Sequence, residues 1–329
     1  MAKPLAVALG DPAGIGPEIV AGAWERRAAE DLPCFFAVGS PEAVAAVWRG
    51  PLRIVSDPDE AEAAWDEALP VIRVEGPADP IPGRPTIDGA RNAFAALELA
   101  VGLARTGAAS ALVTGPVSKA QLYGVGFTHP GQTEFVAERC GVAADMVAMM
   151  LAGPTLRTVP VTTHVALKDV PDLLTTELIV AKGRTAIRGL RRLFGIARPR
   201  LAVAGLNPHA GEEGALGREE IDVVIPAVER LREEEAEVSG PHAADAMFHP
   251  RARGGYDAAL CLYHDQALVP FKTVHFDEGV NITLGLPIVR TSPDHGTAFA
   301  IAGRGQAQPG AMIAALKLAA SCAGRLGQA

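Results

Sequence analysis

Three histidines, His164, His209 and His264, each follow a short apolar run that is typical of a buried parallel strand. Neutral imidazole is a common ligand of zinc and related cations, and three protein ligands with one open position are a usual catalytic arrangement. Carboxylates that could orient such ligands are Asp265, beside one histidine, and Asp245 in the preceding segment. The intervals match no short local motif, so a divalent-metal site and a structural role are equally good interpretations of the residues alone.

Cations and amides are dense in the stretch that follows His264. Lys272, Asn281, Arg290 and His295 lie there between apolar turns. Fixed positive charge and planar donors are what a phosphate or carboxylate binds. We therefore expect a site for a small anionic ligand in this stretch, and we take Lys272 as a candidate catalytic residue together with the two carboxylates named above.

These residues need elements that hold them at one place. Ligands of open α/β sheets bind beyond the carboxyl ends of the strands, where the three histidines are expected. Strands and helices alternate along the chain, which predicts mostly parallel sheets. The clearest predicted strands are 4–9, 34–38, 110–113, 201–204 and 258–263, the clearest helices 88–105, 178–194 and 309–323, and segments 146–151 and 156–161 resemble a hairpin.

A glycine-rich loop at 10–16 follows the first predicted strand, but it does not read GxGxxG, and the chain has no phosphate-binding P-loop pattern. By itself this loop is as consistent with a tight turn as with a ligand loop. Small and cationic residues at 114–119 also follow a predicted strand, and an ordinary connection is an equal alternative there.

Composition limits the class of protein. The chain has 329 residues, of which 49% are hydrophobic, and this suits two α/β domains. The net charge of -8 argues against a nucleic-acid partner. We expect no membrane span and no signal peptide, because no apolar run is long enough and the chain opens directly with a strand. Four scattered cysteines without a CxxC pattern fit a reducing cytoplasm.

Several sequence blocks, in order along nearly the whole chain, resemble the 4-hydroxythreonine-4-phosphate dehydrogenase family of pyridoxal phosphate biosynthesis. They are GDPAGIGPE (10–18), TGPVSK (114–119), GQTE (131–134), THVALKDV (163–170), GLNPHAGEEG (205–214), YHDQALVPFK (263–272) and VNITLGLPIVRTSPDHGTA (280–298). The two ends are also similar to the isocitrate/isopropylmalate dehydrogenase superfamily, which binds NAD without a GxGxxG fingerprint.

The resemblance implies an activity. The family oxidises the C3 hydroxyl of 4-phosphohydroxy-L-threonine with NAD, and the product, 2-amino-3-oxo-4-(phosphooxy)butanoate, loses CO2 to give 3-amino-2-oxopropyl phosphate. The family holds one divalent cation per site through three histidines from two subunits, at positions that match His164, His209 and His264. The resemblance leaves open whether the metal is zinc, magnesium or cobalt, and whether the cofactor is NAD or NADP.

The same resemblance implies further site residues. Substrate contacts match Gln132, Thr133, Lys272, Asn281 and Arg290, and cofactor contacts are expected in the turn formed by Asp294, His295, Gly296, Thr297 and Ala298. Two positions depart from the pattern. Gln132 replaces a frequent histidine and cannot carry its charge, and Ala300 replaces a carboxylate near the cofactor.

We expect a two-domain α/β/α fold, isocitrate/isopropylmalate dehydrogenase-like, with mostly parallel sheets and a site in the interdomain cleft. Residues 1–125 and 295–329 are expected to form domain one, and residues 126–294 domain two, with the metal and substrate ligands and the dimer interface. We also expect a homodimer with a shared active site, in which His264 is the ligand that crosses the interface. The alternatives are a dehydrogenase of another phosphorylated 3-hydroxy acid, a metal-dependent lyase or hydrolase without NAD, and a non-catalytic sugar-phosphate-binding protein.

Overall fold

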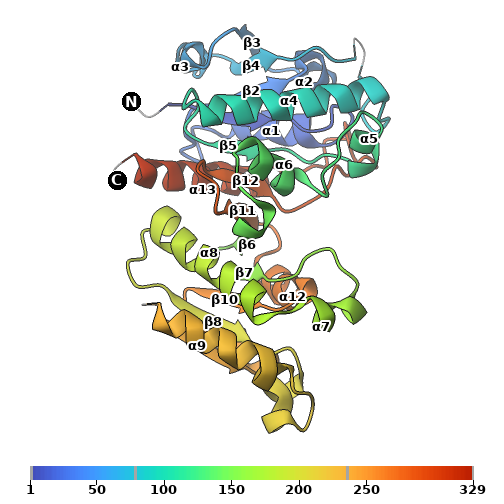
Figure 1. Cartoon of the computed structure of the whole chain (residues 1–329). Helices are drawn as coiled ribbons and strands as arrows, with labels where there is room; N and C mark the ends of the chain where they lie inside the picture. The colour runs from blue at the N-terminus through green and yellow to red at the C-terminus, as the bar shows by residue number, and fades with distance from the viewer. Residues whose placement is uncertain (1–2, 78–79, 235–236, 328–329) are drawn as a thin grey trace. The chain divides into compact units, whose positions relative to one another are not determined.

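The computed structural model describes residues 3–77, 80–234 and 237–327, and it divides the chain into two compact α/β units (Figure 1). The first unit combines Met1–Cys140 with Pro287–Ala329, and the second is Gly141–Leu286. The boundaries therefore differ from those expected at 125/126 and 294/295. The reason is packing: Phe127 and Phe135 lie with their ring centroids 5.6 and 5.5 Å from that of Phe94, which belongs to the first unit.

The first unit contains a parallel sheet in the order β3-β4-β2-β1-β5-β12. Short apolar sequences such as LAVA in β1 are buried at every position, as expected for strands covered on both faces. The strands are β1 (Leu5–Ala8), β2 (Phe35–Gly39), β3 (Leu52–Val55), β4 (Leu69–Arg73), β5 (Leu112–Thr114) and β12 (Arg290–Pro293).

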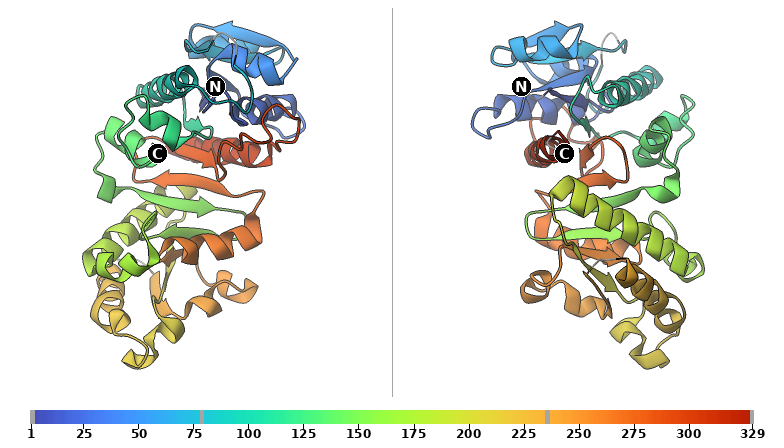
Figure 2. Two further views of the ribbon diagram at one scale, coloured as in Figure 1. Left: turned by 90° about the vertical axis from the view of Figure 1, so that its right-hand side faces the viewer. Right: turned by 60° about the vertical axis from the view of Figure 1, so that its left-hand side comes forward.

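Helices cover both faces of this sheet. Helix α4 contacts β1, β2 and β5, while α13 contacts β12, β5 and β1 and also packs against α1. Figure 2 (left) shows α4 on one side of the strands and α1 and α13 on the other. The helices are α1 (Gly16–Glu25), α2 (Pro41–Val47), α3 (Ala61–Ala64), α4 (Ile87–Arg105), α5 (Lys119–Tyr123), α6 (Gln132–Arg139) and α13 (Gly310–Leu326), with a 3₁₀ turn η1 at Pro58–Glu60.

The second unit contains a mixed sheet in the order β11-β6-β7-β10-β8-β9. The predicted hairpin is present, because β6 pairs antiparallel with β7. Strand β11 also pairs antiparallel with β6, on its other edge. From β7 through β10 and β8 to β9 all pairs are parallel. The strands are β6 (Ala148–Ala152), β7 (Arg157–Pro160), β8 (Arg200–Ala204), β9 (Glu237–His242), β10 (Ala258–Cys261) and β11 (Val280–Leu284).

Helices α8 and α9 pack against each other and against one face of this sheet, and α12 packs on β7 and β10 from the other face (Figure 2). Helix α8 begins where the Thr175 hydroxyl accepts a hydrogen bond from Leu178 N, and ends at Gly195, whose φ of 70° closes it. The helices are α7 (Val170–Leu173), α8 (Thr176–Phe194), α9 (Ile225–Glu233), α10 (Ala244–Met247), α11 (Pro250–Arg253) and α12 (His264–His275). Short turns are η2 (Ala144–Met146), η3 (Leu167–Asp169), η4 (Pro208–Gly214) and the π-helical η5 (Glu220–Val224).

The predicted α/β fold with mostly parallel strands is confirmed. Strands β9, β11 and β12 were not predicted, because Gly-Pro interrupts the first and polar residues occupy buried positions in the other two. Among the described residues, no helix is both long and apolar enough to cross a lipid bilayer.

Candidate active site

The three predicted metal ligands follow three neighbouring parallel strands of the second unit. His164 follows β7, His264 follows β10 and His209 follows β8, and β10 pairs with both of the other strands. Neighbouring strands lie about 4.8 Å apart, and the carboxyl ends of parallel strands meet at one edge of a sheet. Strand order therefore brings three distant parts of the sequence to the same edge.

His164 and His264 form a close pair. Their ring centroids are 5.7 Å apart, and the ring planes are inclined by 43°. The Thr162 hydroxyl donates to the Leu262 carbonyl at 2.9 Å and ties the two strand ends together. Two imidazoles that each place a nitrogen about 2.1 Å from one cation have ring centres on the order of 5 Å apart. The pair therefore fits two ligands of a single divalent ion.

Asp265 gives the His264 ring a defined tautomer. Its Oδ1 lies 2.7 Å from His264 Nδ1, and a carboxylate only accepts, so the imidazole Nδ1 donates. The lone pair of Nε2 is then left for a cation, as in carboxylate–histidine–metal triads. The other predicted carboxylate, Asp245, is exposed on α10, a helix that packs against the η4 turn containing His209.

His209 lies in a left-handed turn. The φ angles of residues 209–213 are 54°, 52°, 81°, 44° and 54°, although left-handed backbone costs an L-residue about 1–2 kcal/mol. The His209 side chain is 70% exposed, with Nδ1 3.6 Å from Glu212 Oε2. Among the described residues, no three histidine, cysteine, aspartate or glutamate side chains gather as a metal site.

The expectation that His264 crosses the interface stays a prediction, and the structure of one chain adds a close pair of histidines that bears on it. The close pair within one chain is His164 with His264, because β7 and β10 are neighbours and Thr162 joins their ends. His209 follows β8, which pairs with the other edge of β10. Among the described residues it does not complete a group of three ligands with the histidine pair.

Two further predicted residues belong to the second unit. Lys272 lies on α12 just over two turns after His264, about 12 Å along the axis at a rise of 1.5 Å per residue and about 80° around it. Asn281 lies in β11, opposite Leu151 of β6. Its buried Oδ1 has no hydrogen-bond partner among the described residues. An orphaned acceptor of this kind fits a contact with a ligand.

In the first unit, Arg290 is the centre of a buried polar cluster. The residue is 3% exposed. One terminal nitrogen, Nη2, donates to Thr114 Oγ1 at 2.7 Å, and Nη1 donates to Thr133 Oγ1 at 3.4 Å. Burial lowers the pKa of the guanidinium to about 10, and the charge of Glu134 opposes this shift. A cation held in so dry a place is well suited to an anionic ligand.

Gln132 lies at the same cluster, where it begins helix α6 next to Thr133. Its Nε2 donates to the Gly115 carbonyl at 3.3 Å, and its Oε1 is buried without a hydrogen-bond partner among the described residues. The structure therefore brings together Gln132, Thr133 and Arg290 of the predicted substrate contacts. The sequence did not single out Thr114 and Glu134, although both lie in the motif blocks.

The predicted cofactor turn lies against the glycine-rich loop of the first unit. Ile15 N donates to the Thr297 carbonyl at 3.0 Å, and Ala298 has a φ of 44°. A Cβ on Gly14 would lie 3.0 Å from the Thr297 carbonyl oxygen, so the two loops approach each other closely here. At Gly296, in contrast, a Cβ would meet nothing within 4 Å. The backbone at Gly296 is therefore accessible to a ligand.

Asp11, in the same loop, is a buried carboxylate that sequence analysis did not select. It is 2% exposed, and Ala13 N donates to its Oδ1 at 3.0 Å. Burial raises the pKa of this carboxyl. A cavity of about 190 Å³ adjoins the loop, lined by Pro12 and Ala13 and by Ile81 and Arg84 of the connection between β4 and α4.

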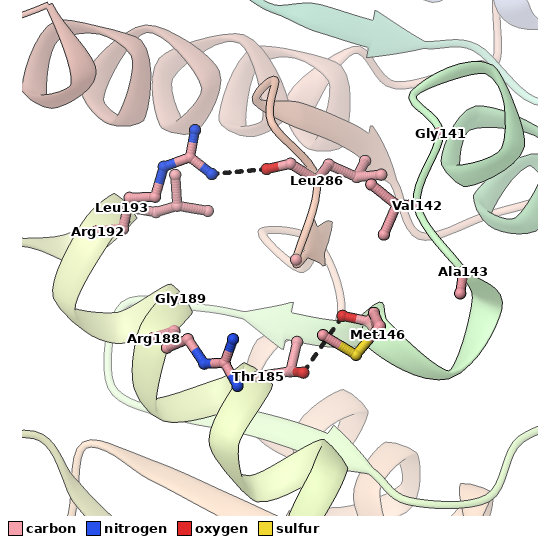
Figure 3. A pocket seen from close by; sticks show the side chains of 11 residues that line it. Gly141, Val142, Ala143, Met146, Thr185, Arg188, Gly189, Arg192, Leu193 and Leu286 are labelled. Atoms are coloured by element: carbon pink, nitrogen blue, oxygen red, sulfur yellow. Dashed lines mark hydrogen bonds between the residues drawn. The ribbon is translucent and has the colours of Figure 1, made fainter.

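A larger hollow of about 450 Å³ lies elsewhere in the second unit (Figure 3). Arg188 and Arg192 of α8 border it, together with Met146 and Leu286, and Arg192 Nη1 donates to the Leu286 carbonyl at 2.7 Å. None of the described residues that line it is a predicted site residue, so size alone does not mark the candidate site.

Exposed apolar side chains flank the histidine pair. Val165 and Leu167 directly follow His164 and are 41% and 67% exposed. On α12, which begins at His264, Val269 is 61% exposed. Apolar surface concentrated beside a polar site is typical of an interaction surface.

Comparison with known proteins points to one family. The family described as "Pyridoxal phosphate biosynthetic protein PdxA" matches residues 32–319. A 4-hydroxythreonine-4-phosphate dehydrogenase of Zymomonas mobilis is 58% identical over 98% of this chain and 96% of its own length. A crystal structure of such a dehydrogenase from Klebsiella pneumoniae has a TM-score of 0.86 at 38% identity, covering 98% of this chain and 99% of that one. A β-decarboxylating dehydrogenase of Thermococcus kodakarensis, with a TM-score of 0.51 at 16% identity over 99% of this chain and 84% of its own, shares the fold alone.

Proposed function

Because the chain belongs to the family of the pyridoxal phosphate biosynthetic protein PdxA, we propose that it is a 4-hydroxythreonine-4-phosphate dehydrogenase. The resemblance inferred from the sequence blocks is confirmed. The proposed reaction is the NAD-dependent oxidation of 4-phosphohydroxy-L-threonine, followed by loss of CO2 to give 3-amino-2-oxopropyl phosphate. Besides the family, one observation on this chain carries the proposal: His164 is paired with His264, and Asp265 lies beside that pair.

We assign His164 and His264 as two ligands of one divalent cation, with His209 of the partner subunit as the third. When bound, the cation supplies positive charge that polarises the oxygen atoms of the substrate at the reacting carbons. Asp265 supports this assignment because it leaves Nε2 of His264 available. Imidazole ligands suit zinc and cobalt better than magnesium.

Arg290 is the proposed anchor of the substrate's phosphate or carboxylate group. Thr114 and Thr133 hold the plane of its guanidinium and so fix the directions of its N–H groups. Gln132 and Asn281 offer buried amide oxygens to donors on the substrate. Lys272 is the proposed proton donor to the carbon that loses CO2, because it lies on the helix, α12, that begins at His264.

Residues 294–298 and the loop at 10–16 would hold the proposed nicotinamide cofactor, which would supply the hydride acceptor. The open backbone at Gly296 and the cavity beside Ala13 support this assignment. No GxGxxG turn is needed where the backbone itself lies open to the dinucleotide.

A homodimer with shared active sites completes the proposal. The apolar side chains beside His164 and His264 fit an interface with a second copy of the chain, and the pair lacks a third ligand among the described residues. Nucleic acid is not a proposed partner, because the net charge is -8. The proposed location is the cytoplasm, which suits four cysteines that are all free.

The test is an assay of cofactor reduction. The purified enzyme is stripped of metal with a chelator and mixed with 4-phosphohydroxy-L-threonine and NAD or NADP. We expect no reduced nicotinamide until zinc, cobalt or magnesium is restored. Failure of all three metals with both cofactors would overturn the proposal.

The alternatives give different outcomes in the same assay. Faster reduction with another phosphorylated 3-hydroxy acid would assign the enzyme to that substrate, and Gln132 is the position that makes this comparison necessary. Turnover of the substrate without cofactor reduction would indicate a metal-dependent lyase or hydrolase.

A further inference from the structure

The carboxylate of Glu220 lies buried beneath the turn that carries His209. Glu220 is 2% exposed and begins the π-helical turn η5. Its Oε1 accepts hydrogen bonds from Leu206 N and Asn207 N, both at 2.7 Å, and its Oε2 accepts from Asn207 Nδ2 at 2.9 Å. One side chain thus holds the segment that enters the left-handed turn.

The same carboxylate also touches the middle of the turn. A Cβ placed on Gly211 would lie 2.6 Å from Glu220 Oε2, so the backbone there approaches the carboxylate more closely than any other residue type allows. Glu220 therefore contacts both the entry and the centre of a backbone segment in which His209, Ala210, Glu212 and Glu213 all have positive φ. Such a conformation persists only where its surroundings determine it.

We propose that Glu220 is a positioning residue for the metal site, which holds the left-handed turn so that the exposed His209 side chain projects outward to the proposed cation. This inference rests on the proposed function of His209 as a metal ligand. Glu220 does not touch the metal or the substrate. Its hydrogen bonds stabilise the left-handed backbone conformation of the turn. Glu220 also begins the π-helical turn η5, and such turns often occur at functional sites.

The isosteric change Glu220→Gln isolates this role. The amide keeps the shape but replaces one acceptor oxygen with an NH2 group that faces N–H donors. Rotation of the Asn207 amide cannot relieve the conflict, because Asn207 Nδ2 also donates to Glu219 Oε2 at 2.7 Å. A flipped Asn207 would direct its oxygen at that carboxylate. The variant therefore removes support for the turn without creating a cavity.

The experiment measures zinc binding to the metal-stripped full-length protein by calorimetry, with thermal unfolding of each metal-free variant as the measure of folding. We expect Glu220→Gln to bind zinc about 10–100-fold more weakly, the usual effect of losing an outer contact of a ligand. Glu229→Gln, an exposed carboxylate of α9 with the same change of charge, is the control and should bind like wild type.

Rescue separates positioning from general stability. Glycine adopts left-handed φ without penalty, so adding Ala210→Gly to Glu220→Gln should restore most of the lost affinity. Wild-type affinity in Glu220→Gln, or no recovery in the double variant, would overturn the inference. His209→Ala tests the premise separately: if it binds zinc like wild type, the proposed ligand set fails and the inference fails with it. If His209→Ala loses zinc while Glu220→Gln does not, only the role of Glu220 is wrong.

Discussion

The imidazole rings of His164 and His264 lie 5.7 Å apart at the ends of two neighbouring parallel strands. Of the three predicted metal ligands, two therefore lie close together in one chain, and His209 is the third. If both rings bind the same cation, His209 rather than His264 is the ligand that crosses the interface, and mixed dimers of inactive variants distinguish the two arrangements.

Mixed dimers of His164→Ala and His209→Ala should regain activity, up to about half of wild type per mixed dimer, because one of the two symmetric sites then keeps all three histidines. Mixed dimers of His164→Ala and His264→Ala should stay inactive, because each site lacks one ligand. Activity is assayed after subunit exchange, and mass spectrometry verifies that mixed dimers form. The opposite pattern would return His264 to the interface.

Arg290→Lys should lower kcat/KM by more than about tenfold, because a lysine cannot reach both Thr114 and Thr133 while presenting planar donors to an anion. The matched control is Arg198→Lys at an exposed position of the second unit, which should leave kcat/KM unchanged. Steady-state kinetics with varied substrate provides the measurement. Equal values for the two variants would remove Arg290 from the substrate site.

Gly296→Val should raise the KM for the nicotinamide cofactor while metal content stays the same. A side chain at this position meets no protein atom within 4 Å, so it projects into space that we assign to the cofactor. Gly324→Val is the control, since its Cβ is equally unobstructed but lies in helix α13. Loss of metal with unchanged cofactor binding would mean that the two sites are interchanged.

Acidification should destabilise the fold through His275. Burial lowers the pKa of its imidazole, against the opposing charge of Glu278, and its Nε2 accepts from Thr155 N at 3.2 Å. The unfolded chain therefore binds this proton more readily, and stability falls as pH drops below about 6.5, the unperturbed value. Above that pH both states are neutral and the contribution is constant.

Urea unfolding of the wild type and of His275→Gln, from neutral pH to about pH 5, measures this contribution. The variant should be less stable at neutral pH, because it loses packing against Phe271 and Gly153. Its stability should also depend less on pH than that of the wild type. Parallel curves for the two proteins would show that His275 does not carry the pH dependence.

Much of the fold follows from local patterns. Apolar runs of four or five residues and long amphipathic segments are specified by neighbours in sequence, so β1, β8 and β10 and helices α4, α8 and α13 lie where the pattern predicts them. Strand β9 does not follow from pattern, because its Gly-Pro sequence becomes a strand only by pairing with β8.

The candidate site divides in the same way. The position of each histidine just past a strand, and the carboxylate beside His264, are properties of the sequence. The pairing of His164 with His264 is not, because it depends on β10 lying between β7 and β8, and strand order results from contacts between distant segments.

The sequence by itself determined the class of fold, the family and the residue types available for chemistry, because these depend on composition, periodicity and motifs. Only the tertiary structure decided that Arg290 is buried against Thr114, that Glu220 supports a left-handed turn, and that residues 126–140 belong to the first unit. Each of these depends on which remote segment packs against which. Burial and long-range hydrogen bonds are properties of the folded chain, and no local pattern encodes them.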